Sequence, residues 1–468
     1  RCTVCNETEC IGSISDLKKR SDRLPMNNGE IDLHKPFIDD IKFKCTKCQS
    51  EMIRISDVLD CWFESGSMPY AQLHYPFENK DEFEKNFPAN FIAEGLDQTR
   101  GWFYTLHVLS TILFDKPAFQ NVIVNGILLA ADGEKLSKRK KNYPDPAKLF
   151  EEKGVDSTRM FLYSSTAPLA EDVRFSDKHV DEIMKKFTLT LWNTYSFFVT
   201  YANIDNFKFN QNAEPSNNIL DKWILSELNS LIIKVTKEMD DYNLTKATRP
   251  MIDFVDNLSN WYVRRSRRRF WKSENDVDKN NAYQSLYIVL VEFTKILAPF
   301  MPFISDEIYR NLTGGESVHL LDWPVANNKV IDSKLNEEIA LARLVVNLGH
   351  AVRARSKIKV RQPLSQIELV LPKNIDPKII ENQRSVILEE LNIKALEIIK
   401  DPKEVAVMIM IPLAKVLGPK FGNKVQEIIK ASKNQNYKII MFHWQDQKHH
   451  GDFSQSHPHL FHPPQKKY

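Results

Sequence analysis

Two pairs of cysteines near the start of the chain have the spacing of metal-binding knuckles. In each pair two residues separate the cysteines, Cys2 from Cys5 and Cys45 from Cys48. Four thiolates can surround a zinc ion tetrahedrally, and they leave no position for a reactive water. The pattern predicts a structural zinc site, with Cys10 as a substitute ligand. The alternative is a set of reduced, unligated thiols.

A second candidate for chemistry is the lysine-rich stretch at residues 132–141, D-G-E-K-L-S-K-R-K-K, which follows an apolar run. Lys135 and Lys138 come just after a turn, where their ammonium groups could reach phosphates. Taken alone, such a run is more typical of a solvated surface or a localisation signal. Its interpretation therefore depends on the sequence around it.

Acids, an amide and a tryptophan gather upstream, in the segment 91–103, F-I-A-E-G-L-D-Q-T-R-G-W-F. A strand that runs into a polar turn and then a helix exposes a ligand site at the carboxyl edge of a sheet. Glu94 could bind an ammonium group, and Asp97 and Gln98 could hydrogen-bond to ribose or ammonium. Trp102 could form one wall of an apolar pocket. The alternative is a turn followed by a core tryptophan.

A second tryptophan lies at a strand-to-turn junction further upstream, in residues 60–66, D-C-W-F-E-S-G. Trp62 could line the same pocket as Trp102, and the alternative is again packing in the core.

The most basic stretch of the chain is residues 260–272, N-W-Y-V-R-R-S-R-R-R-F-W-K, with five arginines, one lysine and no acid. On a helix these residues would form a basic face for phosphates, with aromatic rings able to stack on bases. The alternative places the aromatic rings in a bundle core and the arginines on a solvated or salt-bridged face. The candidate contacts are Trp261, Arg264, Arg265, Arg268 and Arg269.

The elements that must position these groups alternate in type along the chain. Short β-rich runs at 91–93 and 122–124 flank a helical stretch at 102–113, which is the rhythm of a parallel α/β sheet. Further on, apolar residues recur every three or four positions, which predicts a helical bundle broken by the prolines near residue 300. The predicted domains are a Cys-rich insertion at 1–56, an α/β segment at 57–175, a helical domain at 176–326, a mixed domain at 327–432 and a tail at 433–468.

The bulk properties limit the class of protein. The chain has 468 residues, which is long enough for several domains, and a net charge of +3, so a basic surface must be local. It contains no apolar run long enough to cross a membrane and no secretory signal, and six cysteines with two C-x-x-C pairs favour a reducing compartment. A soluble intracellular protein is predicted. The first residue is Arg rather than Met, which predicts a fragment.

The C-terminal part contains fewer residues with an evident chemical role. A strand is predicted near 366–371, and the basic run 353–361 could contact a nucleic-acid backbone or be a solvated charge run. Six of the twelve histidines lie in the tail among prolines and glutamines, so the tail is predicted to be disordered and without chemistry.

Taken together, three ordered motifs resemble those of class I aminoacyl-tRNA synthetases, and in particular the isoleucyl members. Residues 60–66 are similar to D-x-W-F-[DE]-S-G, which valyl enzymes share. Residues 94–103, E-G-x-D-Q-x-R-G-W-F, look like the isoleucyl version, and valyl enzymes differ there. Residues 135–139, K-L-S-K-R, resemble the K-M-S-K-S loop in a variant that looks eukaryotic. The similarity extends to the basic helix, which resembles part of the family's anticodon-binding domain.

The resemblance implies roles for single residues. Lys135 and Lys138 would stabilise the pyrophosphate leaving group as the amino-acid carboxylate attacks ATP, which acts with Mg²⁺. Trp62 and Trp102 would line the aliphatic pocket, and the basic helix would bind the isoleucine tRNA. Contacts with ATP or the adenylate would fall to Glu94, Gly95, Asp97, Gln98, Asn125, Gly126 and Ser137.

The resemblance also implies a fold and a place in the cell. The fold would be the C-terminal half of a Rossmann-type catalytic domain, with a zinc-ribbon-like insertion, a helical anticodon-binding domain and a C-terminal region open to protein partners. The location would be the cytoplasm. The family's His-x-Gly-His motif and editing domain lie upstream and have no counterpart here, so the chain is expected to be half an active site. The rival hypotheses are a valyl enzyme and a noncatalytic zinc-ribbon RNA-binding protein.

Overall fold

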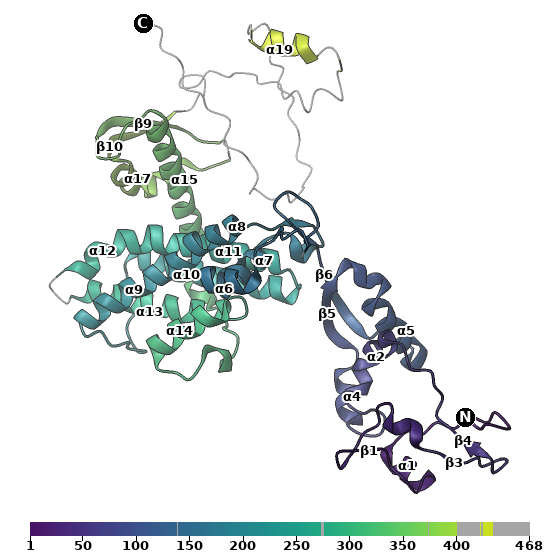
Figure 1. The fold of residues 1–468 in the computed structure, drawn as a ribbon. Helices are drawn as coiled ribbons and strands as arrows, with labels where there is room; N and C mark the ends of the chain where they lie inside the picture. Colours follow the sequence, from purple (N-terminus) through teal and green to yellow (C-terminus); the bar gives the residue numbers. More distant parts are fainter. Residues whose placement is uncertain (138, 273–275, 373, 400–421, 423–424, 434–468) are drawn as a thin grey trace. The chain divides into compact units, whose positions relative to one another are not determined.

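The computed structural model describes residues 1–137, 139–272, 276–372, 374–399, 422 and 425–433. The chain divides into two compact units, which are described separately (Figure 1). The first comprises Arg1–Gln211 and Leu231–Val325, and the second comprises Asn212–Ser230 and the chain from Ala326 onward. Of the residues predicted to act, Lys138 lies outside the described residues, as does the predicted disordered tail from residue 434. No helix in the described ranges is long and apolar enough to cross a membrane.

The Cys-rich segment is held by very little regular structure. Its elements are α1 (Ile14–Arg20), β1 (Met26–Asn27), β2 (Glu30–Ile31), η1 (Phe37–Asp40), β3 (Phe43–Lys44) and β4 (Glu51–Met52). The two hairpins, β1–β2 and β3–β4, are antiparallel. The core here is small, with Cys2, Cys45 and Met52 buried and Phe43 packed against them. This small number of apolar residues supplies little hydrophobic stabilisation. A cross-link or a metal ion would therefore be needed to hold the segment.

A parallel strand pair forms the centre of the next segment, as the sequence predicts. Strands β5 (Ala89–Gly95) and β6 (Phe119–Asn125) are joined by α5 (Trp102–Phe114), whose inner side buries Phe103 and Leu106 against Ile92. The remaining elements are α2 (Cys61–Gly66), α3 (Met68–Ala71), α4 (Lys80–Asn86) and η2 (Leu96–Arg100).

A second, shorter parallel pair follows the first. Strands β7 (Leu128–Leu129) and β8 (Val173–Arg174) pair in register, and between them lie α6 (Pro146–Lys153), α7 (Val155–Ser164) and η3 (Ala167–Leu169). Helix α8 (Asp177–Ile183) follows β8 and covers it with Val180. The loop with the predicted phosphate-binding lysines therefore lies between β7 and α6.

The helical part of the first unit has a closely packed apolar core, including Phe187, Phe254, Tyr262, Phe293 and Phe300. The predicted break near residue 300 is present, because α13 ends at Leu297 and α14 begins at Pro302. The elements are η4 (Met184–Thr188), α9 (Leu189–Ile204), α10 (Ile219–Asp240), α11 (Leu244–Asp256), η5 (Asn257–Val263), α12 (Arg264–Trp271), α13 (Val277–Leu297), α14 (Pro302–Thr313) and η6 (Val318–Leu320). The first part of α10 belongs to the second unit, as does the short η7 (Asn328–Val330).

Helix α7 is tied to this bundle by polar contacts at its first turn. The buried carboxylate of Asp156 accepts hydrogen bonds from the backbone N–H groups of Phe303 (3.4 Å) and Ile304 (2.7 Å) at the start of α14. Arg159 donates to the carbonyls of Pro299 (2.9 Å) and Phe300 (3.0 Å). The two N–H groups lie in the first turn of α14 and the two carbonyls lie after the end of α13, where backbone groups have no partner within a helix. The contacts from α7 therefore cap the break between α13 and α14.

The second unit contains a long helix and another parallel strand pair. Strands β9 (Leu364–Val370) and β10 (Ile393–Ile399) pair in register after the long helix α15 (Ser333–Arg355). Arg353 is buried, and its guanidinium donates to four carbonyls, those of Lys359, Gln362, Leu391 and Asn392. This arginine of the predicted charge run is therefore structural. The other helices are α16 (Pro377–Asn382), α17 (Arg384–Leu391) and α19 (Val425–Lys433).

Candidate functional site

The parallel register of β5 and β6 brings three predicted ligand residues, Glu94, Gly95 and Asn125, to one sheet edge. Glu94 is opposite Val124, and Gly95 is opposite Asn125. The Glu94 and Asn125 side chains are exposed. Carboxyl ends of parallel strands form the usual ligand edge of an α/β sheet.

The turn after β5 is organised by the side chain of Gln98. Its Oε1 accepts the backbone N–H of Trp102 (2.9 Å), and its Nε2 donates to Asp97 (3.3 Å). Gln98 therefore satisfies one of the unpaired N–H groups at the start of α5. Gly101 is needed at this turn, because a Cβ atom there would lie 2.6 Å from Gln98 Oε1 and 3.1 Å from the Trp62 ring.

The two predicted pocket tryptophans come together through α2 and α5. Asp60 caps α2 by accepting the backbone N–H of Trp62 (2.7 Å), and the indole N–H of Trp102 donates to the Ser65 carbonyl (3.1 Å). A Cβ on Gly66 would lie 2.9 Å from a Leu109 methyl group, so glycine allows the two helices to approach closely. The ring of Trp62 remains 45% exposed. Two sequence motifs separated by about 30 residues thus form one surface.

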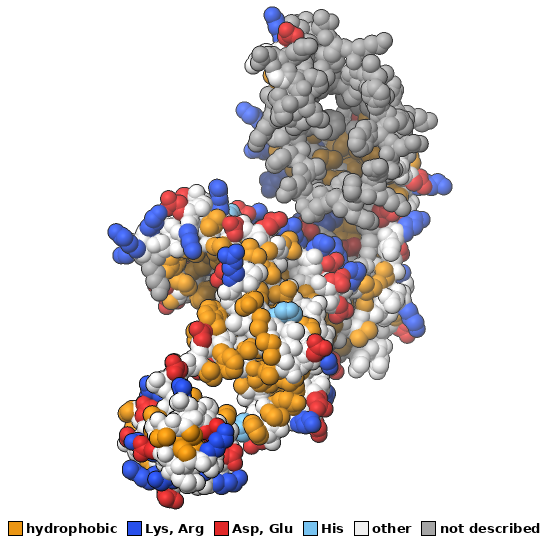
Figure 2. All heavy atoms as spheres, turned by 90° about the vertical axis from the view of Figure 1, so that its right-hand side faces the viewer, with side chains coloured by type: hydrophobic (Ala, Val, Ile, Leu, Met, Phe, Trp, Pro, Cys, Tyr) orange, Lys and Arg blue, Asp and Glu red, His pale blue; other side chains and the backbone are white. Residues whose placement is uncertain are grey.

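Large apolar side chains are unusually exposed in this segment. Figure 2 shows hydrophobic side chains gathered on the surface of this part of the chain. Side chains on a sheet that is covered on both faces would be mostly buried, whereas these are largely exposed: Val58 76%, Leu59 63%, Phe91 49%, Leu96 54%, Tyr104 60%, Ile112 74% and Val122 45%. Contiguous apolar surface of this kind typically marks an interface with other polypeptide.

Asn142 organises the lysine-rich loop, and our sequence analysis missed it. Its Oδ1 accepts the backbone N–H of Ser137 (2.9 Å), and its Nδ2 donates to the carbonyl of Lys135 (3.1 Å). One amide therefore links both sides of the K-L-S turn. The available signal was an asparagine at the end of a lysine run, since Asn side chains commonly replace backbone partners in turns.

One further contact shapes the same loop. Lys140 pairs with Glu134 (2.5 Å), and the hydrogen bond that Lys140 donates to the Glu134 carboxylate raises the pKa of Lys140. Lys135 itself is exposed.

Gly126 has a packing role that accounts for its small size. A Cβ atom at this position would lie 1.9 Å from the backbone carbonyl oxygen of Glu171, a distance at which no side chain fits. Its N–H donates to the Ala167 carbonyl (2.8 Å). The glycine therefore allows the end of β6 to contact the chain before β8, and this packing fixes where the neighbouring Asn125 lies.

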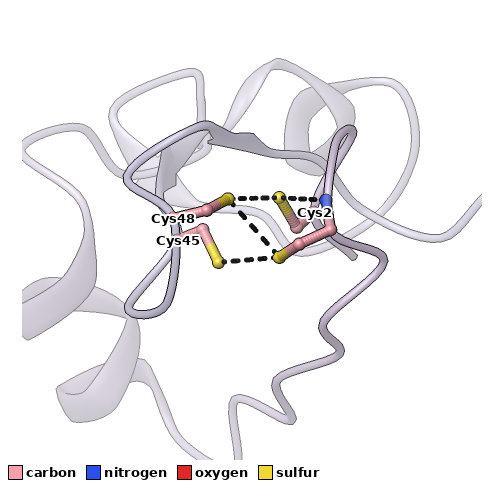
Figure 3. A group of neighbouring side chains, drawn as sticks. Cys2, Cys45 and Cys48 are labelled. Atoms are coloured by element: carbon pink, nitrogen blue, oxygen red, sulfur yellow. Dashed lines mark hydrogen bonds between the residues drawn. The ribbon is translucent and has the colours of Figure 1, made fainter.

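The four predicted metal ligands form one cluster (Figure 3). The sulfur atoms of Cys2, Cys5, Cys45 and Cys48 all lie within 4.8 Å of one another. The Sγ–Sγ distances are 3.4 Å from Cys2 to Cys48, 3.4 Å from Cys5 to Cys48 and 3.6 Å from Cys5 to Cys45. Tetrahedral Zn–S bonds of about 2.3 Å place sulfurs roughly 3.8 Å apart, so the cluster fits a zinc ion.

The surroundings of this cluster favour the thiolate form of Cys2 and Cys48 and disfavour that of Cys5. Backbone N–H groups of Val4 and Cys5 point at the Cys2 sulfur, at 3.4 and 3.5 Å, and lower its pKa. Hydrogen bonds from Ser50, and then from Cys2 and Cys5, lower the pKa of Cys48 to about 6. At Cys5 a hydrogen bond involving the Glu7 backbone acts to lower the pKa, but the neighbouring thiols Cys48 and Cys2 raise it to about 12. Four thiolates this close repel one another, and a dication removes that repulsion.

Helix α12 separates its arginines into an outer and an inner set. Arg264, Arg267 and Arg268 are exposed, whereas Arg269 is 7% exposed. Trp261 is 5% exposed, and the guanidinium groups of Arg264 and Arg265 lie over its ring at 5.9 and 5.5 Å.

The inner set anchors α12 to the start of α13. Arg269 pairs with Asp278 (2.8 Å), and Lys272 pairs with Asp276 (3.1 Å). The buried ammonium group of Lys279 donates to the backbone carbonyl of Lys272 (2.8 Å), which ends α12, and pairs with Asp205 (2.6 Å). Periodicity in the sequence did not reveal this division of roles, because it depends on which side of α12 faces α13.

Comparison with known proteins matches two parts of the chain to protein families. Residues 3–176 match the family of class I tRNA synthetases that includes the I, L, M and V types, and residues 221–369 match the anticodon-binding domain of tRNA ligases. Together with the sheet edge, the lysine loop and the helical domain, these matches place the chain in a class. The chain belongs to the class I aminoacyl-tRNA synthetases.

The particular branch of that class is the isoleucine–tRNA ligases. The chain is 45% identical over 462 residues to the isoleucine–tRNA ligase of Treponema denticola, covering 94% of this chain and 41% of that protein. It is 47% identical over 422 residues to that of Protochlamydia amoebophila, covering 89% and 40%. The chain thus spans about two fifths of the curated relatives it matches. The resemblance of the three motifs to those of the isoleucyl members of class I is confirmed.

A solved structure supports the fold. The leucyl-tRNA synthetase of Agrobacterium radiobacter K84, in a ternary complex with tRNA and LeuAMS, is similar with a TM-score of 0.52 at 17% identity. The similarity covers 75% of this chain and 40% of the other. At this identity it supports a shared fold and no more.

Proposed function

We propose that this chain supplies part of the machinery that ligates isoleucine to its tRNA, using ATP and an isoleucyl-adenylate. The observation that carries the proposal is the placement of Glu94, Gly95 and Asn125 at one sheet edge. This edge is followed by the turn in which Gly101 lies against the Trp62 ring and precedes Trp102. The similarity to isoleucine–tRNA ligases, which continues through the helical domain, supports the choice of substrate.

In the activation step the lysine loop would act on the phosphates of ATP. As the isoleucine carboxylate attacks the α-phosphate, negative charge moves to the departing pyrophosphate, and fixed cations stabilise it best when they are already in place. We assign this role to Lys135 and Lys138, with the N–H and hydroxyl of Ser137 as further donors. Asn142 would hold the loop in shape. Mg²⁺ bound to ATP would neutralise further phosphate charge.

The sheet edge would hold the amino acid and the adenylate. Glu94 would bind the isoleucine ammonium group, and Asp97, Gln98 and the Asn125–Gly126 turn would contact the adenylate. Trp62 and Trp102 would line the aliphatic pocket. Such a pocket separates isoleucine from valine by only about 1–3 kcal/mol, which is why editing accompanies it in the family.

The domain ranges predicted from the sequence belong to the same proposal. Residues 57–175 would be the C-terminal half of a Rossmann-type catalytic domain, and the exposed apolar surface around β5 and β6 supports completion of that domain by further polypeptide. Residues 176–326 would bind the tRNA, and residues 327–432 would form a further mixed domain. The cytoplasm would be the site of the reaction.

Residues 1–56 would form a zinc-ribbon-like insertion. The four-cysteine cluster would hold a structural zinc ion, because four sulfur ligands complete the tetrahedral shell. Its contribution would be to the folding of this segment and not to catalysis.

Binding of tRNA tests the proposal on the chain as it stands. Nitrocellulose filter binding would compare transcripts of isoleucine tRNA and valine tRNA at several salt concentrations. We expect tighter binding of the isoleucine tRNA, with affinity that falls as salt rises. Equal binding of the two tRNAs, or none of either, would contradict the proposal.

A further inference from the structure

The indole of Trp271 is the largest exposed aromatic surface on the basic helix α12. This side chain is 54% exposed, whereas Trp261 and Phe270 of the same stretch are 5% and 1% exposed. A tryptophan that large usually buries most of its surface, so a half-exposed one at a helix end needs an explanation. Tyr262 is buried as well, so burial divides the four aromatic residues of this stretch into three that pack inside and one that faces outward.

Trp271 shares its face of the helix with the exposed arginines. Residues 264, 267, 268 and 271 are spaced by three, four and seven, which puts them along one side of an α-helix. All four are exposed. Three guanidinium groups and one indole thus form a single surface, to which we give the name outer face of α12.

The end of the helix that carries Trp271 is fixed by contacts on its inner face. Lys279 donates to the carbonyl of Lys272, the residue that directly follows Trp271, and Arg269 pairs with Asp278. Lys279 is itself held by the Asp205 carboxylate, to which Tyr283 also donates a hydrogen bond. These anchors involve the inner face alone, so they hold the backbone at residue 271 without covering the indole.

The two acids near the Trp271 end of this face pair with other residues. Asp276 and Asp278 lie close by, but they pair with Lys272 and with the inner Arg269. Arg264 donates to the backbone carbonyl of Asn260 (2.8 Å), so its position along the helix is fixed. The outer face therefore offers the positive charge of Arg267 and Arg268 on the helical turn that precedes a flat apolar ring.

We infer that Trp271 is a stacking platform for an unpaired base of the bound tRNA, with Arg267 and Arg268 contacting the phosphates beside that base. This inference rests on the proposed function and goes further by naming the residue and the kind of contact. A basic surface with one exposed ring is complementary to a single-stranded loop, in which bases are free to stack on aromatic side chains. A double-stranded stem would use the charges and leave the ring unused.

Stacking and charge make different contributions that binding can separate. Loss of a stacked base typically weakens binding by about 5- to 150-fold, corresponding to the stacking energies of single bases. Stacking does not release counterions, so this loss should be the same at every salt concentration. Loss of one phosphate contact should instead reduce the slope of log affinity against log salt by about one.

The experiment measures binding of an isoleucine tRNA transcript to the full chain at four salt concentrations. The variants are Trp271→Ala, Trp271→Phe and Arg267→Ala, with Trp192→Ala as the control, since Trp192 is a second partly exposed tryptophan (38%) of the same unit. We expect W271A to lose about 5- to 150-fold at unchanged slope, W271F to lose less, R267A to lower the slope, and W192A to bind like the unaltered chain.

A second measurement reports on the ring itself. Stacking of a base quenches indole fluorescence, so part of the quenching by saturating tRNA should disappear in W271F. Circular dichroism of each variant checks that the helices remain folded.

Two results would overturn the inference while leaving the proposed function intact. One is W271A binding tRNA as tightly as the unaltered chain. The other is W192A weakening binding as much as W271A, which would mean that loss of any surface tryptophan has this effect. Absence of tRNA binding by the unaltered chain would instead overturn the proposed function, and the inference with it.

Discussion

Two amide side chains, those of Gln98 and Asn142, bond to the backbone of the turns in which the predicted ligand residues lie. Gln98 caps α5, and Asn142 bridges Lys135 to Ser137. Such side-chain contacts replace missing backbone partners and give a short loop a defined shape.

At this scale we predict that Asn142→Ala loosens the lysine loop. Two hydrogen bonds of about 1 kcal/mol each would be lost, so local opening should become roughly tenfold to thirtyfold more frequent. Limited digestion with trypsin, which cleaves after lysine and arginine, measures this opening as cleavage within residues 135–141. Asn121→Ala is the matched control, because Asn121 also donates to a backbone carbonyl, that of Asn90, but outside the loop. Equal cleavage in N142A and N121A would contradict the role of Asn142.

At the scale of elements, polar anchors rather than apolar packing alone fix where the ends of several helices lie. The ammonium group of Lys279 joins the end of α12 to Asp205, just after α9. Burial acts to raise the pKa of Asp205, but the hydrogen bonds from Lys279 and Tyr283 outweigh it and the net pKa is lowered.

This anchor predicts a particular dependence of stability on pH. Because the folded state lowers the pKa of Asp205, the ion pair stabilises the fold above the ordinary value of 3.8 and ceases to do so as pH falls through the lowered pKa. Asp205→Asn leaves a buried ammonium without its counter-charge, so at pH 7 we expect a loss of about 3–5 kcal/mol. Urea unfolding followed by circular dichroism measures the difference in free energy of unfolding between the unaltered chain and D205N. We expect the full difference from pH 7 to about 5 and a smaller one below 3.8. A difference in free energy of unfolding that does not change with pH would exclude the ion pair as its cause.

The Cys-rich segment is predicted to depend on zinc, while the helical part does not. A buried core this small cannot hold the two hairpins, so metal binding should supply most of their folding energy. We expect zinc to co-purify with the chain, and a chelator or Cys45→Ser to expose residues 1–56 to proteolysis without changing the melting of the helices. Cys61→Ser is the control, since this exposed thiol lies outside the cluster. Retention of zinc by C45S would refute the assignment of ligands.

At the scale of the whole molecule, the chain covers about two fifths of the length of its isoleucine–tRNA ligase relatives. The described α/β segment holds one paired set of strands at the ligand edge and leaves much apolar surface exposed. Activation of an amino acid needs ATP and isoleucine held together in one enclosed site, because water must be excluded and the reacting atoms aligned.

We therefore predict that the purified chain binds tRNA but does not activate isoleucine. The measurement is isoleucine-dependent exchange of pyrophosphate into ATP, with valine for comparison and a complete isoleucine–tRNA ligase as the positive control. No exchange is expected with either amino acid. Exchange that prefers isoleucine would show that this part of the molecule forms a working site unaided.

Much of this was predictable from the sequence, because local patterns carry it. The strands at 91–93 and 122–124, the helix from Trp102 and the break near residue 300 all follow from hydrophobic periodicity and proline placement, and the structure contains each of them. The C-x-x-C spacing indicated the cysteine cluster, and motif order indicated the class of enzyme.

Other features depended on the tertiary structure. Whether an arginine of residues 264–269 faces solvent or α13 depends on which side of the helix packs inward, and periodicity in an almost uniformly basic stretch gives no such information. The same holds for Trp261 and Trp271, which look equivalent in sequence but are buried and exposed respectively. The bridging role of Asn142 and the contact of Gly126 with Glu171 join residues through space. Sequence patterns determine local conformation, whereas burial and contact are properties of the packed chain, so only the folded structure decided them.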